Sequence, residues 1–316
     1  MCVISRDLQP PRKREDDNTC WNSIQMINRR NSVILVKMVI CFVMWAAFLD
    51  HNARAEEASV EISADAIMQK SYAVYSGDDS LSRITFTFQE KGFPEKKLVY
   101  TMAWKRFTQG EYEAKVMMFR EFPPDAKGVS YMGFFYTPNP SRNDDEWVYL
   151  PELRMVRKLS HSGPKHAKQE EFAPSELRQY DLMPRHPEYD TQQLMGTEKL
   201  GDVDCYVIQS TPKPNGAEAY PYSKVVKWIS KDNFLPLRID YYADAQGSNE
   251  HGRLYKQQET KWKKFAKAWV WEEVKGVNML TGNKTTLTVS DVRINVGLTD
   301  ESFSKRTMQL GIEGVK

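Results

Sequence analysis

Short segments in which apolar and polar residues alternate recur along the chain from residue 83 onward. Side chains of a strand point alternately to its two faces, so this pattern, bounded by Gly, Pro and charged residues, predicts strands joined by turns. The predicted strands are 83–89, 97–105, 114–120, 129–136, 147–150, 155–159, 205–209, 224–230, 237–242, 269–274 and 284–293. Helical spacing is confined to 63–75, where Ser63 is a candidate N-cap, and to a weaker segment at 174–181.

The order of these elements predicts the fold class. A parallel sheet needs a helix between successive strands, and such helices are missing from the pattern. The sequence therefore predicts a mainly β protein built on an antiparallel sheet that is curled or closed. Residues 160–192 hold four Pro and three of the five His without a strand pattern, and we expect an irregular, functional excursion there.

The N-terminal segment has the features of an export signal. Residues 38–49 are an apolar run of 12 residues, preceded by Arg29, Arg30 and Lys37 and followed by an Ala-Arg-Ala sequence at 53–55. This run is shorter than the roughly 20 residues of a membrane-spanning helix, although an uncleaved anchor is the alternative. We expect a signal peptide at 26–55, cleavage after Ala55, and a single periplasmic domain at 56–316.

Residues 1–25 do not resemble part of a signal peptide. They are polar and contain Pro10, Pro11 and a run of charged residues at 12–17. A start at Met26 would give a well-formed signal, so we interpret 1–25 as an N-terminal extension of the reading frame that is not part of the natural protein.

Charge and cysteine content limit the possible partners and the covalent cross-links of the exported domain. The first 55 residues contain 8 of the 44 Lys and Arg and 5 of the 42 Asp and Glu, which leaves 36 basic and 37 acidic residues for the rest. This balance does not favour nucleic acid as a partner. Cys205 is the only cysteine after residue 55, so the exported domain has no internal disulfide. Its apolar strand context predicts a buried, inert thiol.

Motifs of known catalytic sites are missing from the sequence. It contains no G-x-S-x-G, no phosphate-binding loop and no H-E-x-x-H. His161 and His166 lack the spacing that places two imidazoles on one helix face. We therefore expect no enzyme activity, no metal and no cofactor.

Bulky apolar side chains alternate along several predicted strands. On a strongly curved sheet they would line a hollow that suits an apolar ligand, whereas on a flat sheet they would form a filled core, and the pattern leaves both open. The candidate cavity residues are Phe86, Phe88, Met102, Trp104, Met132, Phe134, Trp147, Tyr149 and Trp228.

A basic stretch follows the strand at 147–150. Its candidate contact residues are Arg154, Arg157 and Lys158, which could meet anionic lipid head groups or an acidic partner. The alternative is a solvated surface balanced by nearby carboxylates such as Glu152.

Several separated segments, taken together, resemble the outer-membrane lipoprotein-sorting-like proteins, relatives of the LolA-type carriers whose members are largely uncharacterised. The matching segments are 64–70, DDEWVYLPELRMVRK at 144–158, YSKVVKWI at 222–229, LPLRIDYY at 235–242 and SDVRINVGLTD at 290–300, with Phe303 and Arg306. They occur in the right order and span roughly 62–308.

The resemblance implies a LolA-like fold, an incomplete antiparallel β-barrel with one or two helices covering an apolar cavity. Proteins of this fold carry acyl chains across the periplasm, and relatives include sensor domains for lipidated proteins and associates of proton-driven exporters. The lid residues of the best carriers have no match here, and we expect the excursion at 160–192 to take their place.

Three functional hypotheses follow. The leading one is a periplasmic carrier or chaperone for an acyl chain, phospholipid or lipoprotein, acting in lipoprotein sorting or lipid transport. The second is an accessory or sensor module that docks an inner-membrane exporter or another envelope protein. The third is a lipid hydrolase that uses the 160–192 excursion, although the sequence shows no nucleophile with a placed base.

Overall fold

The computed structural model describes residues 62–137, 144–159, 175–183, 185–214, 220–243 and 252–315. Residues 62–316 form one compact unit. The predicted export signal, the predicted N-terminal extension and the pair His161 and His166 lie outside the described residues.

One antiparallel sheet of 13 strands makes up most of this unit. Its spatial order is β6-β5-β4-β3-β2-β1-β13-β12-β11-β10-β9-β8-β7, so most strands pair with their neighbours in sequence. The strands are β1 (Asp79–Gln89), β2 (Lys96–Arg106), β3 (Tyr112–Phe122), β4 (Ser130–Tyr136), β5 (Asp145–Leu150), β6 (Met155–Lys158), β7 (Asp190–Leu200), β8 (Val203–Pro212), β9 (Tyr222–Ser230), β10 (Pro236–Ala243), β11 (Leu254–Phe265), β12 (Ala268–Asn278) and β13 (Lys284–Ile294).

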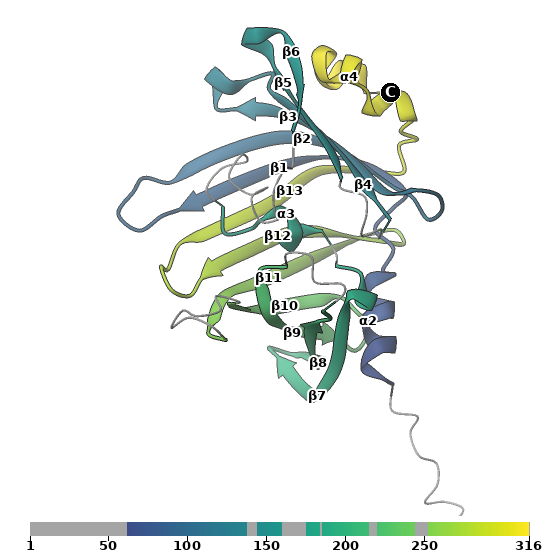
Figure 1. Ribbon diagram of the computed structural model, residues 1–316, viewed down its shortest axis with the longest axis vertical. Helices are drawn as coiled ribbons and strands as arrows, with labels where there is room; N and C mark the ends of the chain where they lie inside the picture. Colours follow the sequence, from purple (N-terminus) through teal and green to yellow (C-terminus); the bar gives the residue numbers. More distant parts are fainter. Residues whose placement is uncertain are drawn as a thin grey trace, which may run out of the picture. The chain divides into compact units, whose positions relative to one another are not determined.

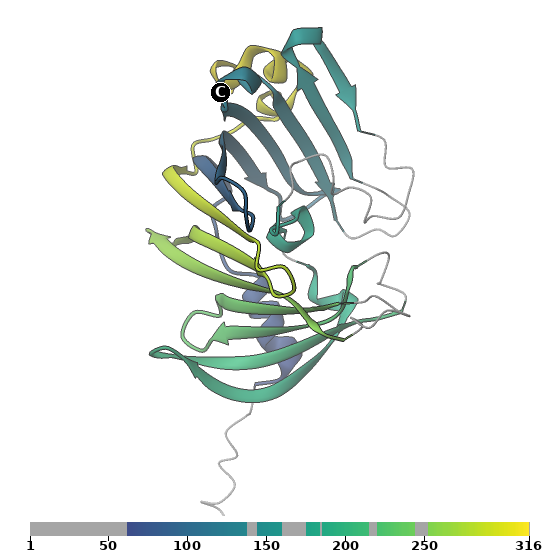
Figure 2. The ribbon, with the colours of Figure 1, turned by 90° about the vertical axis from the view of Figure 1, so that its left-hand side faces the viewer.

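The sheet curls but does not close, because β6 and β7 at its two ends do not pair with each other. Figures 1 and 2 show these edge strands at opposite ends of the curve, with the short helix α3 (Gln179–Leu182) inside it. The prediction of a mainly β protein with a curved antiparallel sheet and few helices is confirmed.

The helix predicted at 63–75 is also confirmed, as α2 (Ala64–Tyr72). The Ser63 hydroxyl caps it by accepting a hydrogen bond of 3.2 Å from the Ala66 amide. Ile67 and Met68 on its buried face pack against Ile208 and Ile229 of the β8–β9 pair. In the described ranges, no helix combines the length and apolar content needed to cross a membrane.

Two strands were not predicted. The strands β7 and β11 are rich in Gln, Lys, Glu and Thr, so their apolar alternation is weak. In β11, the inward positions are occupied by polar residues such as Lys256, Gln258 and Thr260, all buried. The prediction that 160–192 lacks a strand is wrong at its end, because β7 begins at Asp190.

The C-terminal segment packs on the face of β1–β5 that points away from the concave side. It comprises the turns η5 (Asp300–Phe303) and η6 (Gly311–Gly314) and the helix α4 (Lys305–Leu310). Leu298, Phe303 and Met308 join Met117 and Met132 in one core cluster. The strands β3 and β4 are therefore buried on both faces, unlike strands of a sheet with one solvent-exposed face.

A buried carboxylate fixes the start of this segment. Asp79 accepts hydrogen bonds from the amides of Val296 (2.6 Å), Gly297 (3.1 Å) and Leu298 (2.8 Å). Further along, the buried Lys115 ammonium pairs with Asp300 at 2.9 Å. The two contacts orient the chain as it leaves β13 toward the core cluster.

We expect Asp79→Ala to destabilise the protein by about 2 kcal/mol, because the amides of Val296, Gly297 and the buried Leu298 lose their shared acceptor. Urea unfolding would measure this change. Asp78→Ala is the matched control, since the neighbouring side chain is exposed and should cost little. Equal stability of the two variants would contradict the role of Asp79.

Candidate functional site

The concave face of the sheet holds a cavity of about 440 Å³. Its walls come from β1–β4 on one side, β9–β13 on the other, α2 and the segment 175–185. The volume lies within the range of roughly 300–1,000 Å³ that is usual for small-molecule sites. Most of the lining is aliphatic or aromatic.

Four of the nine predicted cavity residues line this space: Phe86, Phe88, Met102 and Trp104. The antiparallel register explains their convergence, because Phe86 lies opposite Leu98 and Trp104 opposite Ser80 across the β1–β2 pair. The rings of Phe86 and Phe88 stack with centroids 6.1 Å apart.

The other five predicted residues do not line this cavity. Met132, Phe134, Trp147 and Tyr149 pack in the core cluster under the C-terminal segment. In β4 it is the alternate positions, Tyr131 and Phe135, that line the cavity. The ring of Trp228 lies outside it, where its indole N–H donates to Glu198 at 2.9 Å and Arg238 stacks on the ring at 4.4 Å.

The aromatic wall on the other side was not predicted from the sequence. Trp262, Trp269 and Trp271 of the β11–β12 hairpin line the cavity together with Tyr241 of β10. Trp269 and Trp271 do alternate in the predicted strand 269–274, so a signal for them was present. Trp262 lies in β11, whose polar sequence concealed the strand.

The segment 175–183 runs through the concave side and forms part of the cavity wall. Leu177 is buried against Ile84, Val274 and Leu287 from three strands. Gly276 of β12 permits this approach, because a Cβ there would stand 2.8 Å from Leu177 Cδ2. The weak helix predicted at 174–181 corresponds in part to α3.

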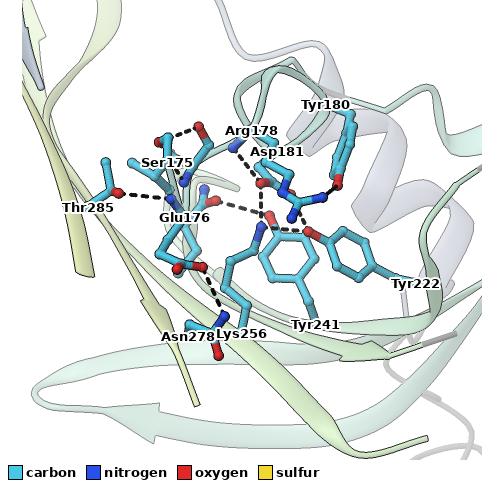
Figure 3. Close-up of polar contacts among 12 residues, drawn as sticks. Ser175, Glu176, Arg178, Tyr180, Asp181, Tyr222, Tyr241, Lys256, Asn278 and Thr285 are labelled. Carbon is cyan, nitrogen blue, oxygen red and sulfur yellow. Dashed lines mark hydrogen bonds and ion pairs between the residues drawn. The ribbon is translucent and has the colours of Figure 1, made fainter. Parts of the chain in front are cut away.

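A buried polar network fixes this segment to the sheet (Figure 3). Asp181 forms an ion pair with Lys256 of β11, and Tyr222 donates to Asp181 at 2.9 Å. Lys256 also donates to the Tyr222 hydroxyl at 2.5 Å, and the Arg178 amide donates to Asp181 at 2.8 Å. Burial lowers the pKa of Lys256, and the Asp181 charge opposes that shift.

Glu176 adds a second anchor beside this network. Its amide donates to the Thr285 hydroxyl at 2.9 Å, and its carboxylate accepts from the Asn278 side chain at 3.2 Å. Burial raises the pKa of Glu176, while the bond from Asn278 opposes the rise. The segment is therefore held at both β13 and β12 as well as at β11.

At the other end of the cavity, the last turn of α2 contacts β2 and β3. The Tyr72 hydroxyl donates to Glu113, and Arg106 donates to the Val74 carbonyl at 3.2 Å. Burial raises the pKa of Glu113, and the hydrogen bond from Tyr72 opposes it. Since Ile67 and Met68 pack on β8 and β9, α2 connects strands from both halves of the sheet.

The described ranges contain no group of three or more His, Cys, Asp or Glu side chains arranged for a metal. Cys205 is buried and unpaired with another cysteine, and burial raises the pKa of its thiol.

The predicted contact residues lie at one edge of the sheet. Arg154 is in the turn before β6, and Arg157 and Lys158 are in β6 itself; all three are exposed. The Lys158 ammonium pairs with Asp145 of β5 at 2.6 Å. Leu153 and Met155 beside them are exposed, by 64% and 45%.

We expect Lys256→Met to lower the free energy of unfolding by about 3–5 kcal/mol, because it leaves the Asp181 carboxylate buried without its cation. The double variant Lys256→Met, Asp181→Leu should recover much of this loss. Chemical unfolding and hydrogen exchange at 175–183 would measure both. Lys261→Met is the control. Lys261 is an exposed lysine on the same strand as Lys256, and loss of its ion pair with Glu273 of β12 should change the free energy of unfolding little. A double variant as unstable as the sum of its single variants would show that the pair is not coupled.

Comparison with known proteins places the chain in a family. A family model described as "Uncharacterized protein" matches residues 112–310. Among curated proteins, none matches the chain.

Solved structures share the fold over most of the chain. A DUF1329 family protein from Desulfovibrio piger is 25% identical, with a TM-score of 0.66 over 78% of this chain and 98% of that one. A putative outer membrane lipoprotein-sorting protein domain from Vibrio parahaemolyticus is 23% identical, with a TM-score of 0.64 over 78% and 98%. A LolA superfamily protein from Nitrosomonas europaea is 19% identical, with a TM-score of 0.54 over 78% and 99%.

These matches agree with the resemblance found in the sequence motifs and with the curved, unclosed sheet. The chain belongs to the family that this model describes as an uncharacterised protein, and it has the LolA-like fold.

Proposed function

We propose that the protein is a non-enzymatic carrier or chaperone that binds an acyl chain of a lipid or lipoprotein in the concave cavity. The observation that carries this proposal is the largely apolar cavity of about 440 Å³ on the concave face. The name of the similar Vibrio domain, a putative lipoprotein-sorting protein, points the same way.

The chemistry of the walls suits a flexible hydrocarbon. Transfer of an acyl chain from water would be favourable by roughly 25 cal/mol per Å² of apolar surface buried. Met102, Met118 and Met183 are among the lining residues, and unbranched thioether side chains adapt to chains of different shape. Trp104 and Trp271 supply rigid apolar area on opposite walls.

The setting of this activity is the periplasm. The export signal expected at 26–55 and the name of the Vibrio relative support this setting. Loading and release would require α2 or the segment 175–183 to move, at a cost of a few kcal/mol that a membrane or partner protein supplies.

The first test is direct. The full chain would be expressed in a Gram-negative host, purified without detergent, and examined by native mass spectrometry beside lipid mass spectrometry of a solvent extract. A stoichiometric lipid or acylated species supports the carrier. A clean apo mass, with no uptake from phospholipid vesicles, would contradict it.

We expect Met118→Trp to reduce lipid retention by about tenfold or more, since the half-buried Met118 lines the cavity and the added indole fills it. Lipid per protein after vesicle incubation is the measurement. Met195→Trp is the matched control, because Met195 lies on β7 with 55% of its surface exposed and does not line the cavity. Equal retention in both variants would place the ligand elsewhere.

A second function, docking to an inner-membrane exporter or another envelope protein, is favoured by the edge of the sheet. Among the described strands β6 ends the sheet order, so within that part of the chain its outer edge has no pairing strand. Exposed Leu153 and Met155 accompany the cations Arg154 and Arg157 there. Such an edge suits a membrane protein with an acidic, extended segment.

We expect Arg154→Glu with Arg157→Glu to abolish capture of a membrane protein from detergent extracts while leaving lipid binding intact. Lys263→Glu with Lys264→Glu, two exposed cations on β11, is the charge-matched control. If both double variants captured the membrane protein equally well, β6 would not be the docking edge.

A further inference from the structure

Lys227 of β9 is a buried cation that lines the cavity. Only 9% of its surface is exposed. Its cross-strand neighbours are Ile208 on β8 and Ile239 on β10, so neither adjacent strand offers a carboxylate directly opposite. A buried ammonium in such surroundings is costly unless something pairs with it.

The described part of the chain supplies no hydrogen bond or ion pair to the Lys227 ammonium. Asp190 is the carboxylate whose charge acts on it, but Asp190 is bonded to Arg185 Nε at 2.8 Å. Burial accordingly lowers the pKa of Lys227 to about 8, with Asp190 opposing and Arg185 reinforcing the shift. This contrasts with Lys256, whose ammonium is bonded to Asp181 and Tyr222.

Among the charged residues of the whole lining, cations outnumber carboxylates. Four cations line the cavity, namely Arg106, Arg178, Arg185 and Lys227, against the two carboxylates Glu113 and Asp181. Lys256 neutralises Asp181 and Asp190 pairs with Arg185, which leaves Arg106, Arg178 and Lys227 against Glu113. The cavity therefore combines apolar walls with an excess of positive charge, which favours an amphiphile with a negative head group.

We propose that Lys227 is a binding residue for the anionic head group of the ligand, a carboxylate or phosphate attached to a hydrocarbon chain that lies along the apolar walls. Arg185 also lines the cavity near Lys227, and its guanidinium is held by Asp190 at 2.8 Å. This inference rests on the proposed carrier function and specifies its ligand class.

The test compares ligands that differ only in head group. Binding of dodecanoate, dodecyl phosphate and the neutral dodecanol to the full chain would be measured by calorimetry, with inorganic phosphate as the anion without a chain. We expect the alkyl anions to bind at least about tenfold more tightly than dodecanol, as one charge-assisted contact implies. Inorganic phosphate alone should not bind measurably.

Three lysine variants complete the design. Lys227→Met keeps the length of the side chain in an apolar environment and should remove the preference for the anions while dodecanol still binds. Lys227→Arg should retain the preference. Lys224→Met, on the same strand with its ammonium over the Tyr242 ring, should behave as the unmodified protein.

The outcomes separate the two proposals. Equal affinity for anions and dodecanol, or an anion preference that survives Lys227→Met, would overturn the head-group role while leaving the carrier intact. Binding of inorganic phosphate as tight as that of the alkyl anions would show a phosphate site and overturn the lipid assignment. Failure of every alkyl probe to bind would overturn both.

Discussion

The interior of this protein depends on the ion pair between Lys256 and Asp181. It joins a sheet strand to a segment that has almost no regular structure of its own, inside a space where water cannot stabilise either charge. Buried pairs of this kind add little net stability compared with apolar packing, but they are costly to separate. The ion pair therefore fixes the position of the segment 175–183 on the concave face. Because this segment forms part of the cavity wall, its position also determines the shape of the cavity.

The second constraint is that β2–β4 have little exposed surface on either face. One face lines the cavity and the other packs beneath the C-terminal segment. Alternating apolar side chains then occur on both sides of the same strands, and sequence alternation alone cannot tell the two sides apart. For this reason Met102 and Trp104 line the cavity, whereas Met132 and Phe134, chosen by the same criterion, pack in the core cluster.

The fold was largely accessible from the sequence, because eleven of its strands and α2 carry strong local patterns. The strands β7 and β11 could not be predicted, because several of their inward positions carry polar residues. The burial of these residues is explained only by their partners in the folded protein. Lys256 illustrates this: in the sequence it is one of many surface-type lysines, and only its contact with Asp181, 75 residues away, explains its burial. Lys227 was hidden for the same reason, inside a family motif whose apolar residues attracted attention first.

The position of α2 connects cavity access to the curvature of the sheet. Its first turns pack on β8 and β9, and its last residue, Tyr72, donates to Glu113 on β3, which six strands separate from β9 in the sheet order. A change in curvature that separates these strands must therefore break one of the two contacts. The apolar contact of Ile67 and Met68 has no directional requirement and tolerates sliding, whereas the hydrogen bond between Tyr72 and Glu113 is lost after a small displacement. Opening should thus begin at the Tyr72 end of α2, next to Trp104 and Arg106, which are part of the cavity wall there.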